Sequence, residues 1–392
     1  MAKSPLPAAN ADRWTICAGS VQAESAKPPI LGQRNEAREE GKACKEIAMQ
    51  ILRSYQEPVA KILTPLDFID TLSDNGVLIT ISLMDCVMEF VNDVIDYANT
   101  HGCLQDLKIE ERVDLGYIYP GMYGFCDVYH YDPDMLMLTV WEAKFGRHAI
   151  EAFENPQAVE WITGVATENC IQTDVLNMLA IEFRLIQPRA WHSEGTIRKW
   201  LCDYEEVLPV LDRLHRKAIE SQSSDPSCVP GPHCSGCNAR HRCGALTKAG
   251  HIAMHLAMGI EDATLEGAEL GFELTTLNHM MKVIKARITG LEEQVKATIQ
   301  SGEDNVPGWD MARSQKRQRW KPGVKPQQIV EEAELLYDFD LRKPDFNATP
   351  KQAITRGLDP DFVEQYSETP LGELKLVPDD GSKARQAFRR RK

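Results

Sequence analysis

Two apolar stretches of this chain carry charged residues where a buried strand would lie. Asp127 lies within the run 125–131, and a second run, 135–141, leads into Glu142-Ala-Lys144. The sequence Asp132-Pro-Asp134 between them is typical of a turn. Apolar, β-branched and aromatic residues around a short turn predict a β-hairpin. Because side chains alternate between the faces of a strand, Glu142 and Lys144 should point the same way, with Asp127 close by.

Two carboxylates and an ammonium group at one point suit metal-assisted phosphodiester hydrolysis. Mg²⁺ takes one or two protein carboxylates and leaves its other positions to water and phosphate. A bound metal makes a nucleophile from water, and Lys144 can orient that water or neutralise developing charge. The alternative is a solvated acidic hairpin with a surface lysine, because Glu-x-Lys is a common triplet. The apolar flanks favour a functional site, since charges in buried strands need a reason.

A second pattern, Cys234-x2-Cys237-x5-Cys243, predicts three thiolates around one metal centre. The chain has eleven cysteines, no apolar signal core at its start and no run approaching the ~20 apolar residues of a membrane-spanning helix. We therefore expect a cytoplasmic protein, in which thiols stay reduced and clustered cysteines indicate a metal rather than disulfides.

Two cysteines are candidates for the fourth ligand of this centre. Cys228 would complete a local site, which is typical of Zn²⁺. Cys17 would complete a site that spans the chain, which is typical of an iron–sulfur cluster. The other five cysteines are expected to be mostly small buried hydrophobic residues: Cys86, Cys103, Cys126, Cys170 and Cys202.

The length of 392 residues allows two or three domains. Periodicity predicts helices at 36–55, 77–99, 155–167 and 196–221, with strands at 111–116, within 123–144 and at 178–187. This order predicts an α/β fold, a sheet with helices on its faces. Residues 1–35 are expected to be irregular apart from a short piece bearing Cys17. The predicted divisions of the chain are 1–35, 36–250, 251–305 and 306–392, the last a small C-terminal domain with helices at 327–337 and from Thr349.

Residues 245–301 are predicted to be mostly helical, with a long amphipathic stripe that should pack against the core or a partner helix. Its apolar residues are Leu277, Met280, Met281, Ile284, Ile288, Leu291 and Val295.

The net charge of −14 argues against a protein that coats DNA generally, but local charge decides what enters a cleft. One basic stretch with an interleaved tryptophan predicts contacts to phosphates and base stacking. Its residues are Arg313, Lys316, Arg317, Arg319 and Trp320. The basic tail from Lys383 to Lys392 predicts either DNA contact or a disordered segment. No Gly-rich phosphate loop is present, so no nucleotide cofactor is expected.

Several further motifs accompany the hairpin and the cysteines in a fixed order. They are Ala11–Ser20, Glu40-Gly-Lys-Ala-Cys44, Asn155-Pro-Gln157-Ala-Val-Glu-Trp161, Gln187–His192, Pro307-Gly-Trp309 and Pro370–Pro378. With Asp127 and Glu142-x-Lys144, this set resembles the RecB-like PD-(D/E)XK nucleases. The similarity extends along nearly the whole chain to a phage and prophage family of such proteins.

This resemblance implies a restriction-endonuclease-like α/β core with flanking helices and a small C-terminal α-rich domain. It implies a Mg²⁺- or Mn²⁺-dependent DNA nuclease, an exonuclease serving phage recombination or replication in the host bacterial cytoplasm. Asp127 and Glu142 would be metal ligands, Lys144 the catalytic lysine, and Gln157 would place the phosphate or the water. A single-strand annealing recombinase is the implied partner. The implied 4Fe–4S ligands are Cys17, Cys234, Cys237 and Cys243.

One position departs from the resemblance. Such enzymes commonly carry a metal-binding histidine in a Gly-x-x-His setting of the first helix, where this chain has Cys44. A soft thiol is a poor ligand for Mg²⁺. Glu40 lies four residues earlier on the same helical face and is therefore a candidate metal ligand. Otherwise the site has fewer protein ligands, or the chain is a DNA-end-binding or assembly module that does not cleave. A zinc-stabilised adaptor, with Cys228 as fourth ligand, is a third possibility.

Overall fold

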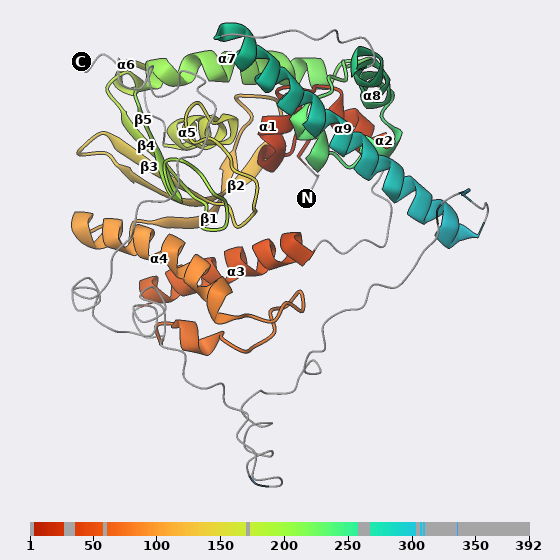
Figure 1. The fold of residues 1–392 in the computed structure, drawn as a ribbon. Coiled ribbons are helices and arrows are strands. Elements are labelled where there is room, and N and C mark those ends of the chain that lie inside the picture. The colour runs from red at the N-terminus through yellow and green to blue at the C-terminus, as the bar shows by residue number, and fades with distance from the viewer. Residues whose placement is uncertain are drawn as a thin grey trace.

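The computed structural model describes residues 4–26, 36–57, 61–169, 173–257 and 267–302, together with 306, 307, 309 and 335. These residues form a mixed α/β fold in which a five-stranded sheet has helices on both faces (Figure 1). The predicted fold class, α/β, is thereby confirmed. No helix within the described ranges combines the length and the apolar character needed to cross a membrane.

The sheet follows the order of the sequence. Its strands are β1 (Lys108–Asp114), β2 (Tyr123–Asp132), β3 (Met137–Ala143), β4 (Ala180–Ile186) and β5 (Ile197–Cys202). Only β3 and β4 are parallel, and the other neighbouring strands are antiparallel. The β2–β3 hairpin forms as predicted. The side chain of Asp132 closes its turn by accepting hydrogen bonds from the backbone N–H groups of Asp134 and Met135, each at 2.9 Å.

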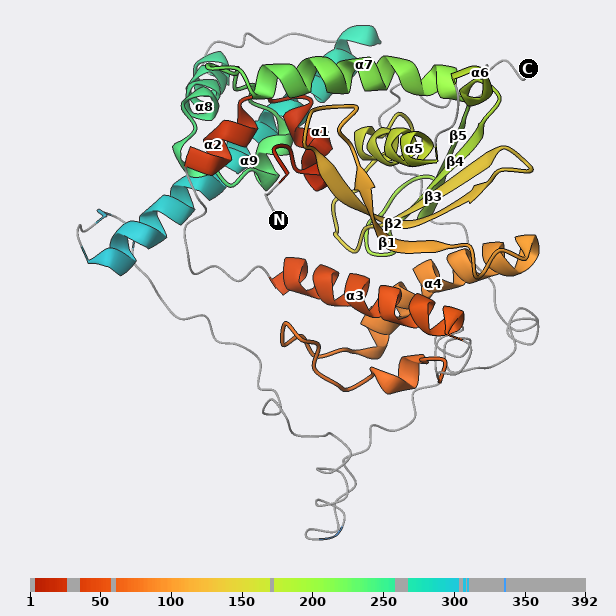
Figure 2. The ribbon, with the colours of Figure 1, turned by 180° about the vertical axis from the view of Figure 1, so that it is seen from behind.

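Two helical layers cover the sheet (Figures 1 and 2). Helices α3 (Glu36–Gln56) and α4 (Ile81–His101) lie on one face, and α5 (Pro156–Glu168) and α7 (Tyr204–Ser221) lie on the other. Along β3, Trp141 and Ala143 point into the α3–α4 core, whereas Leu138 and Val140 point into the α5–α7 core. This alternation is the strand periodicity on which the sequence prediction rested.

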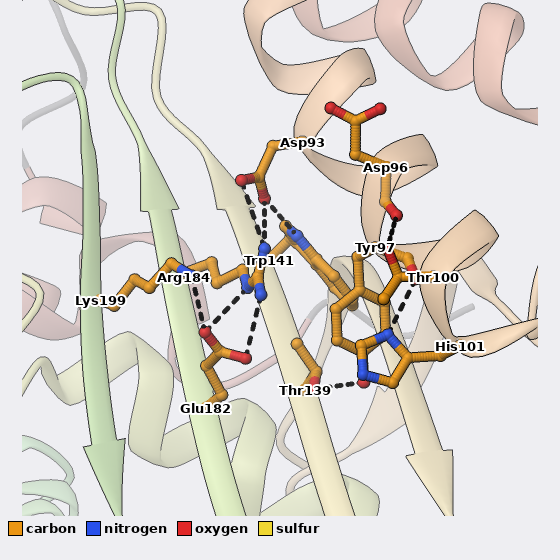
Figure 3. A network of polar contacts seen from close by, with 10 residues as sticks. All are labelled: Asp93, Asp96, Tyr97, Thr100, His101, Thr139, Trp141, Glu182, Arg184 and Lys199. Atoms are coloured by element: carbon orange, nitrogen blue, oxygen red, sulfur yellow. Dashed lines mark hydrogen bonds and ion pairs between the residues drawn. The ribbon is translucent and has the colours of Figure 1, made fainter.

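A buried polar network holds α4 against the sheet (Figure 3). Asp93 of α4 accepts hydrogen bonds from the indole of Trp141 at 2.9 Å and from the guanidinium of Arg184 at 3.1 Å. Glu182 pairs with Arg184 and with Lys199, each at 3.1 Å. Because each buried charge has an opposite partner, the network fixes the position of α4 without leaving an uncompensated ion.

The described part of the N-terminal segment, residues 4–26, is more regular than predicted, since its helices extend beyond the short piece bearing Cys17 that was excepted. It forms η1 (Ala8–Asn10), α1 (Ala11–Trp14) and α2 (Ser20–Ala26). Leu6 and Trp14 are fully buried in the α5–α7 core, and the indole of Trp14 donates a hydrogen bond to Pro7 O at 3.2 Å. Elements this short have too little periodicity to be recognised, but the apolar area that they bury fixes them in place.

The predicted helix over 196–221 was wrong in its first part, which is strand β5. Arg198, Trp200 and Cys202 are buried and alternate with more exposed residues, a period of two rather than 3.6. Asp203 then starts α7 through a capping box, accepting from the backbone N–H of Glu206 at 3.1 Å.

The remaining helices agree with the predictions apart from their ends. Helix α4 begins at Ile81 rather than at 77, because the side chain of Thr80 caps it by accepting from the backbone N–H of Leu83. The other elements are η2 (Pro65–Asp67), α6 (Thr173–Leu176), η3 (Pro232–Gly236), η4 (Arg240–Arg242), α8 (Gly244–Ala257) and α9 (Ala268–Ser301). The predicted C-terminal domain and its helices lie outside the described residues, apart from the four isolated positions.

Candidate active site and candidate metal centre

The two predicted carboxylates meet where strands β2 and β3 separate. Backbone pairing between these strands ends at Val128 and Trp141. Asp127 immediately precedes Val128 in β2, and its Oδ2 accepts a hydrogen bond from the backbone N–H of Ala143 at 2.9 Å. A side chain thus replaces the backbone acceptor that a paired strand would supply. Glu142, the next residue of β3, completes this junction, which we call the β2–β3 fork.

Lys144 and Gln157 reach the same point, so the structure brings all four predicted catalytic residues together. The ammonium of Lys144 pairs with Glu142 Oε1 at 2.8 Å and donates to Gln157 Oε1 at 2.7 Å. The other oxygen of Glu142 accepts a hydrogen bond from the indole N–H of Trp161 at 2.9 Å. Helix α5 therefore orients Lys144 and Glu142 through two side chains four residues apart, which share one helical face.

Gly124 explains how Trp161 reaches this position. A Cβ atom at Gly124 would lie 2.4 Å from the indole ring of Trp161 and 2.9 Å from the Cβ of Ala8. Only glycine allows this close approach between β2 and α5. The N–H of Trp161 thereby supplies the hydrogen bond to Glu142 that fixes the carboxylate.

Sequence reasoning missed Lys45, which reaches the fork from α3 and pairs with Asp127 Oδ1. A lysine in an amphipathic helix gives no signal that distinguishes it from a solvated one. The ion pair matters because the side chain of Asp127 is only 1% exposed and needs a compensating charge. With Lys45 included, two ammonium groups balance the two carboxylates of the fork.

Two further residues of α3, Cys44 and Glu40, bear on metal binding. Cys44 is fully buried in the α3–α4 core, and burial raises the pKa of its thiol to about 12. It is therefore a neutral packing residue. The carboxylate of Glu40 is bound by the guanidinium of Arg189, from the segment that follows β4. Glu40 is thus already engaged in an ion pair, and its part in metal binding stays a prediction.

The electrostatics of the fork distinguish its two carboxylates. Burial, followed by the charge of Glu142, raises the pKa of Asp127 to about 6, although Lys45 opposes the shift. Burial also acts on Glu142, but the charges of Lys144 and Lys45 outweigh it and lower the pKa of this carboxyl. The pKa of Lys45 is raised because the attraction of Asp127 and Glu142 exceeds the opposing effect of its own burial.

A third acidic residue near the fork was not predicted. Glu160 of α5 is fully buried, and within the described part of the chain neither of its oxygens has a hydrogen-bond partner. Burial and the charge of Glu142 raise its pKa well above the ordinary value, so this carboxyl is neutral.

The donor set of the fork fits a hard cation in part. No three His, Cys, Asp or Glu side chains among the described residues are arranged to hold a metal ion. Two carboxylates are nevertheless sufficient for Mg²⁺, which keeps several waters when it binds proteins. The ammonium of Lys45 pairs with Asp127, so a metal held by this carboxylate would compete with Lys45.

The predicted cysteines lie together around η3 and η4, where five thiols line a cavity of about 20 Å³. They are Cys17, Cys228, Cys234, Cys237 and Cys243. Backbone and side-chain hydrogen bonds bring the N-terminal segment to this loop: Gly19 N–H donates to Ser227 O at 2.8 Å, and Arg13 donates to Gly236 O at 2.7 Å. Residues more than two hundred positions apart thus line one pocket, although within the described ranges no three of these thiols are arranged to hold a metal ion.

Both candidates for the fourth ligand are in this pocket. Cys17 Sγ accepts the backbone N–H of Val229, and Cys234 Sγ accepts that of Gly231, each at 3.4 Å. Such N–H···S bonds suit a thiolate ligand. The Cys228 thiol is hydrogen-bonded to Cys17 and Cys243. Partial burial is the main cause that raises the pKa of this thiol to about 11, and these two neighbours add to it. The structure therefore brings both candidates to the pocket and leaves both alternatives open.

The remaining predicted residues divide into two groups. Cys103, Cys126 and Cys202 are buried as expected, and Cys86 is half-buried. Cys170 and the proposed DNA-contacting residues lie outside the described residues: Arg313, Lys316, Arg317, Arg319 and Trp320.

Comparison with known proteins gives a family but no activity. No curated protein matches the chain. A family model described as a protein of unknown function, DUF2800, matches residues 3–383. Since this match covers nearly the entire sequence, the chain belongs to the DUF2800 family.

Proposed function

We propose that this protein is a metal-dependent DNA nuclease of the RecB-like PD-(D/E)XK type, an exonuclease that processes DNA ends. The observation that carries the proposal is the convergence of Asp127, Glu142, Lys144 and Gln157 at the β2–β3 fork. Two buried carboxylates on neighbouring strands, next to an ammonium held by two hydrogen-bond partners, form a preorganised arrangement for phosphodiester hydrolysis.

Each residue of the fork has a role in this proposal. Asp127 and Glu142 hold the metal, which when bound supplies positive charge and a water of lowered pKa. Lys144 is fixed by Glu142 and Gln157, so its remaining N–H can orient the attacking water or contact the phosphate. Trp161 keeps the Glu142 carboxylate in place by donating to its second oxygen.

Lys45 links metal binding to the substrate. It pairs with Asp127 in the described structure, so binding of a metal requires its ammonium to leave that oxygen. Lys45 is part-exposed, and its released ammonium can pair with a DNA phosphate at the same site. With a metal on the carboxylates, the two ammonium groups of the fork would be available to a DNA phosphate.

The thiol pocket supports a second part of the proposal, a structural 4Fe–4S cluster on Cys17, Cys234, Cys237 and Cys243. These thiols would join the N-terminal segment to the η3–η4 loop, and the free energy of cluster binding would stabilise the fold. Zn²⁺ with Cys228 as a ligand is the alternative, since thiolates bind both. The phage setting, the bacterial cytoplasm and an annealing recombinase as partner rest on the family resemblance alone.

The test is the degradation of end-labelled linear DNA and of closed circular DNA with Mg²⁺ or Mn²⁺. We expect the native protein to degrade only linear DNA, in a metal-dependent way. Lys144→Ala should abolish the activity while keeping the fold. Lys42→Ala is the matched control, because Lys42 is an exposed lysine of α3 paired with Glu39. Equal activity in the Lys144 and Lys42 variants would refute the assignment, and cleavage of circles would make the protein an endonuclease.

A non-cleaving DNA-end-binding module is the second candidate, and two observations favour it. Asp127 is already neutralised by Lys45, and the usual histidine position is a buried, neutral Cys44. This function predicts that binding to DNA ends survives EDTA and that no divalent metal produces cleavage. Gel-shift measurements with and without EDTA, made beside the degradation assay, separate the two candidates.

A further inference from the structure

Helix α9 carries a regular apolar stripe. Counting along the helix from Leu270 to Val295 in alternating steps of four and three residues, every position reached is Leu, Met, Ile or Val. This spacing averages 3.5 residues, which is the heptad repeat of a coiled coil rather than the 3.6 period of an isolated surface helix. The stripe spans more than three heptads, which is long enough to indicate helix pairing.

The described fold leaves this stripe largely uncovered. Its residues Leu270, Leu274, Leu277, Met281, Ile288 and Leu291 are between 42% and 59% exposed. Monomeric proteins rarely leave a contiguous row of large apolar side chains in water, and such rows mark interaction sites.

The face of α9 that packs on the protein is a different one. Val283, Ala286 and Gly290 are buried against the η3–η4 loop, where a Cβ at Gly290 would lie 2.8 Å from Arg240 O. Glu293 on this face pairs with Arg240. With the stripe at heptad positions a and d, these residues fall at positions c and f, on the opposite side of the helix. The stripe therefore points away from the protein, and both views show the C-terminal end of α9 extending beyond the sheet and its helices (Figures 1 and 2).

We propose that the α9 stripe pairs with the same stripe of a second copy of this chain, forming a parallel two-stranded coiled coil. A heptad stripe is self-complementary, as a two-fold interface requires. In parallel pairing each g residue faces the e residue five positions later on the partner helix. Arg287 at g, whose guanidinium donates to His241 O at 3.4 Å in the single chain, would turn to face Glu292 at e, giving two opposite-charge pairs across the axis. Lys285 at e would face the neutral Met280 at g. This inference is independent of the proposed nuclease activity.

The test is the molar mass of the full-length protein in solution, measured by light scattering at tens of micromolar. We expect a mass near twice the 44.1 kDa of the chain. The double variant Leu277→Glu, Ile288→Glu should be monomeric. Both side chains are about half exposed, so the fold should be retained, and circular dichroism checks this. The matched control is Phe272→Glu, which makes the same kind of change at outer position f, where the ring is 75% exposed, and should remain a dimer.

Charge reversal tests the orientation. Arg287→Glu should weaken the dimer about tenfold, because both exposed ion pairs are replaced by repulsion. Adding Glu292→Arg to the same chain should restore it, since the pairs are re-formed with reversed sign. A monomeric native protein, as expected if another segment of the chain covers the stripe, would overturn the proposal. So would a dimer that survives the double variant, or a reversal that is not restored.

Discussion

Replacing Lys45 with methionine tests the β2–β3 fork without relying on activity. The change keeps the apolar stem of the side chain and removes only the charge that faces Asp127. Asp127 is 1% exposed and Lys45 is 36% exposed, so the pair lies between a buried and a surface ion pair. Breaking a buried pair costs about 3–5 kcal/mol, whereas an exposed pair contributes about 0–1 kcal/mol. We therefore expect Lys45→Met to lower the free energy of unfolding by about 2–3 kcal/mol in the absence of divalent metal.

Divalent metal should reverse this loss. A cation that binds the fork replaces the missing charge and no longer has to displace an ammonium group. A ligand at one hundred times its dissociation constant stabilises the folded state by about 2.7 kcal/mol, enough to offset the substitution. Urea unfolding at neutral pH with and without millimolar Mg²⁺ measures both effects. Mg²⁺ should stabilise the variant more than it stabilises the native protein.

The matched control is Lys42→Met, which removes a charge from the same helix. Lys42 is 56% exposed and pairs with Glu39 on its own helix, so its loss should change stability by less than about 0.5 kcal/mol. If Lys45→Met is as stable as this control, the ion pair does not contribute as argued. If Mg²⁺ stabilises neither protein, the fork does not bind the metal.

Three other outcomes are expected. After anaerobic purification, Cys228→Ser should retain the iron content of the native protein and Cys17→Ser should lose most of it, and the reverse result would make Cys228 the fourth ligand. Gly124→Ala should lower stability by about 2–3 kcal/mol through overpacking, whereas Gly146→Ala, at a position with no atom within 4 Å of the added Cβ, should be nearly neutral in the same unfolding assay. Because burial and the neighbouring carboxylate raise the pKa of Asp127 to about 6, protons compete with metal there below that pH. Mg²⁺ affinity measured by calorimetry should fall by up to about tenfold per pH unit below 6 and level off above it, and a constant affinity would contradict this.

The sequence was sufficient to predict elements with a strong local signal. The turn at Asp132 and the apolar alternation around it located the hairpin, and alternation also predicted that Glu142 and Lys144 share a face, as their 2.8 Å contact shows. Gln157 was placed correctly because Asn155 and Pro156 mark the start of its helix. These features depend on residues close together in the chain.

The features that sequence reasoning missed depend on distant residues. Lys45 becomes part of the fork only because α3 packs on the sheet, and no local pattern separates it from other lysines of that helix. Trp161 reaches Glu142 because Gly124, thirty-seven positions earlier, leaves room for its ring. Strand β5 was mistaken for helix because six residues adjoin a longer amphipathic segment, and its role as an edge strand is fixed by pairing with β4.

The N-terminal segment has a consequence for synthesis of the protein. Its contacts with the η3–η4 loop and with the end of α7 join residues about two hundred positions apart, such as Gln22 with Ser221 and Arg13 with Gly236. At about 5–20 residues per second, a ribosome needs about 11 to 45 s to extend the chain from Cys17 past Cys243. During that time the Cys17 thiol lacks the backbone N–H of Val229 and the other thiols of the pocket. Cys17 therefore waits longer for its native partners than Trp14, whose indole already has Pro7 O beside it in the chain.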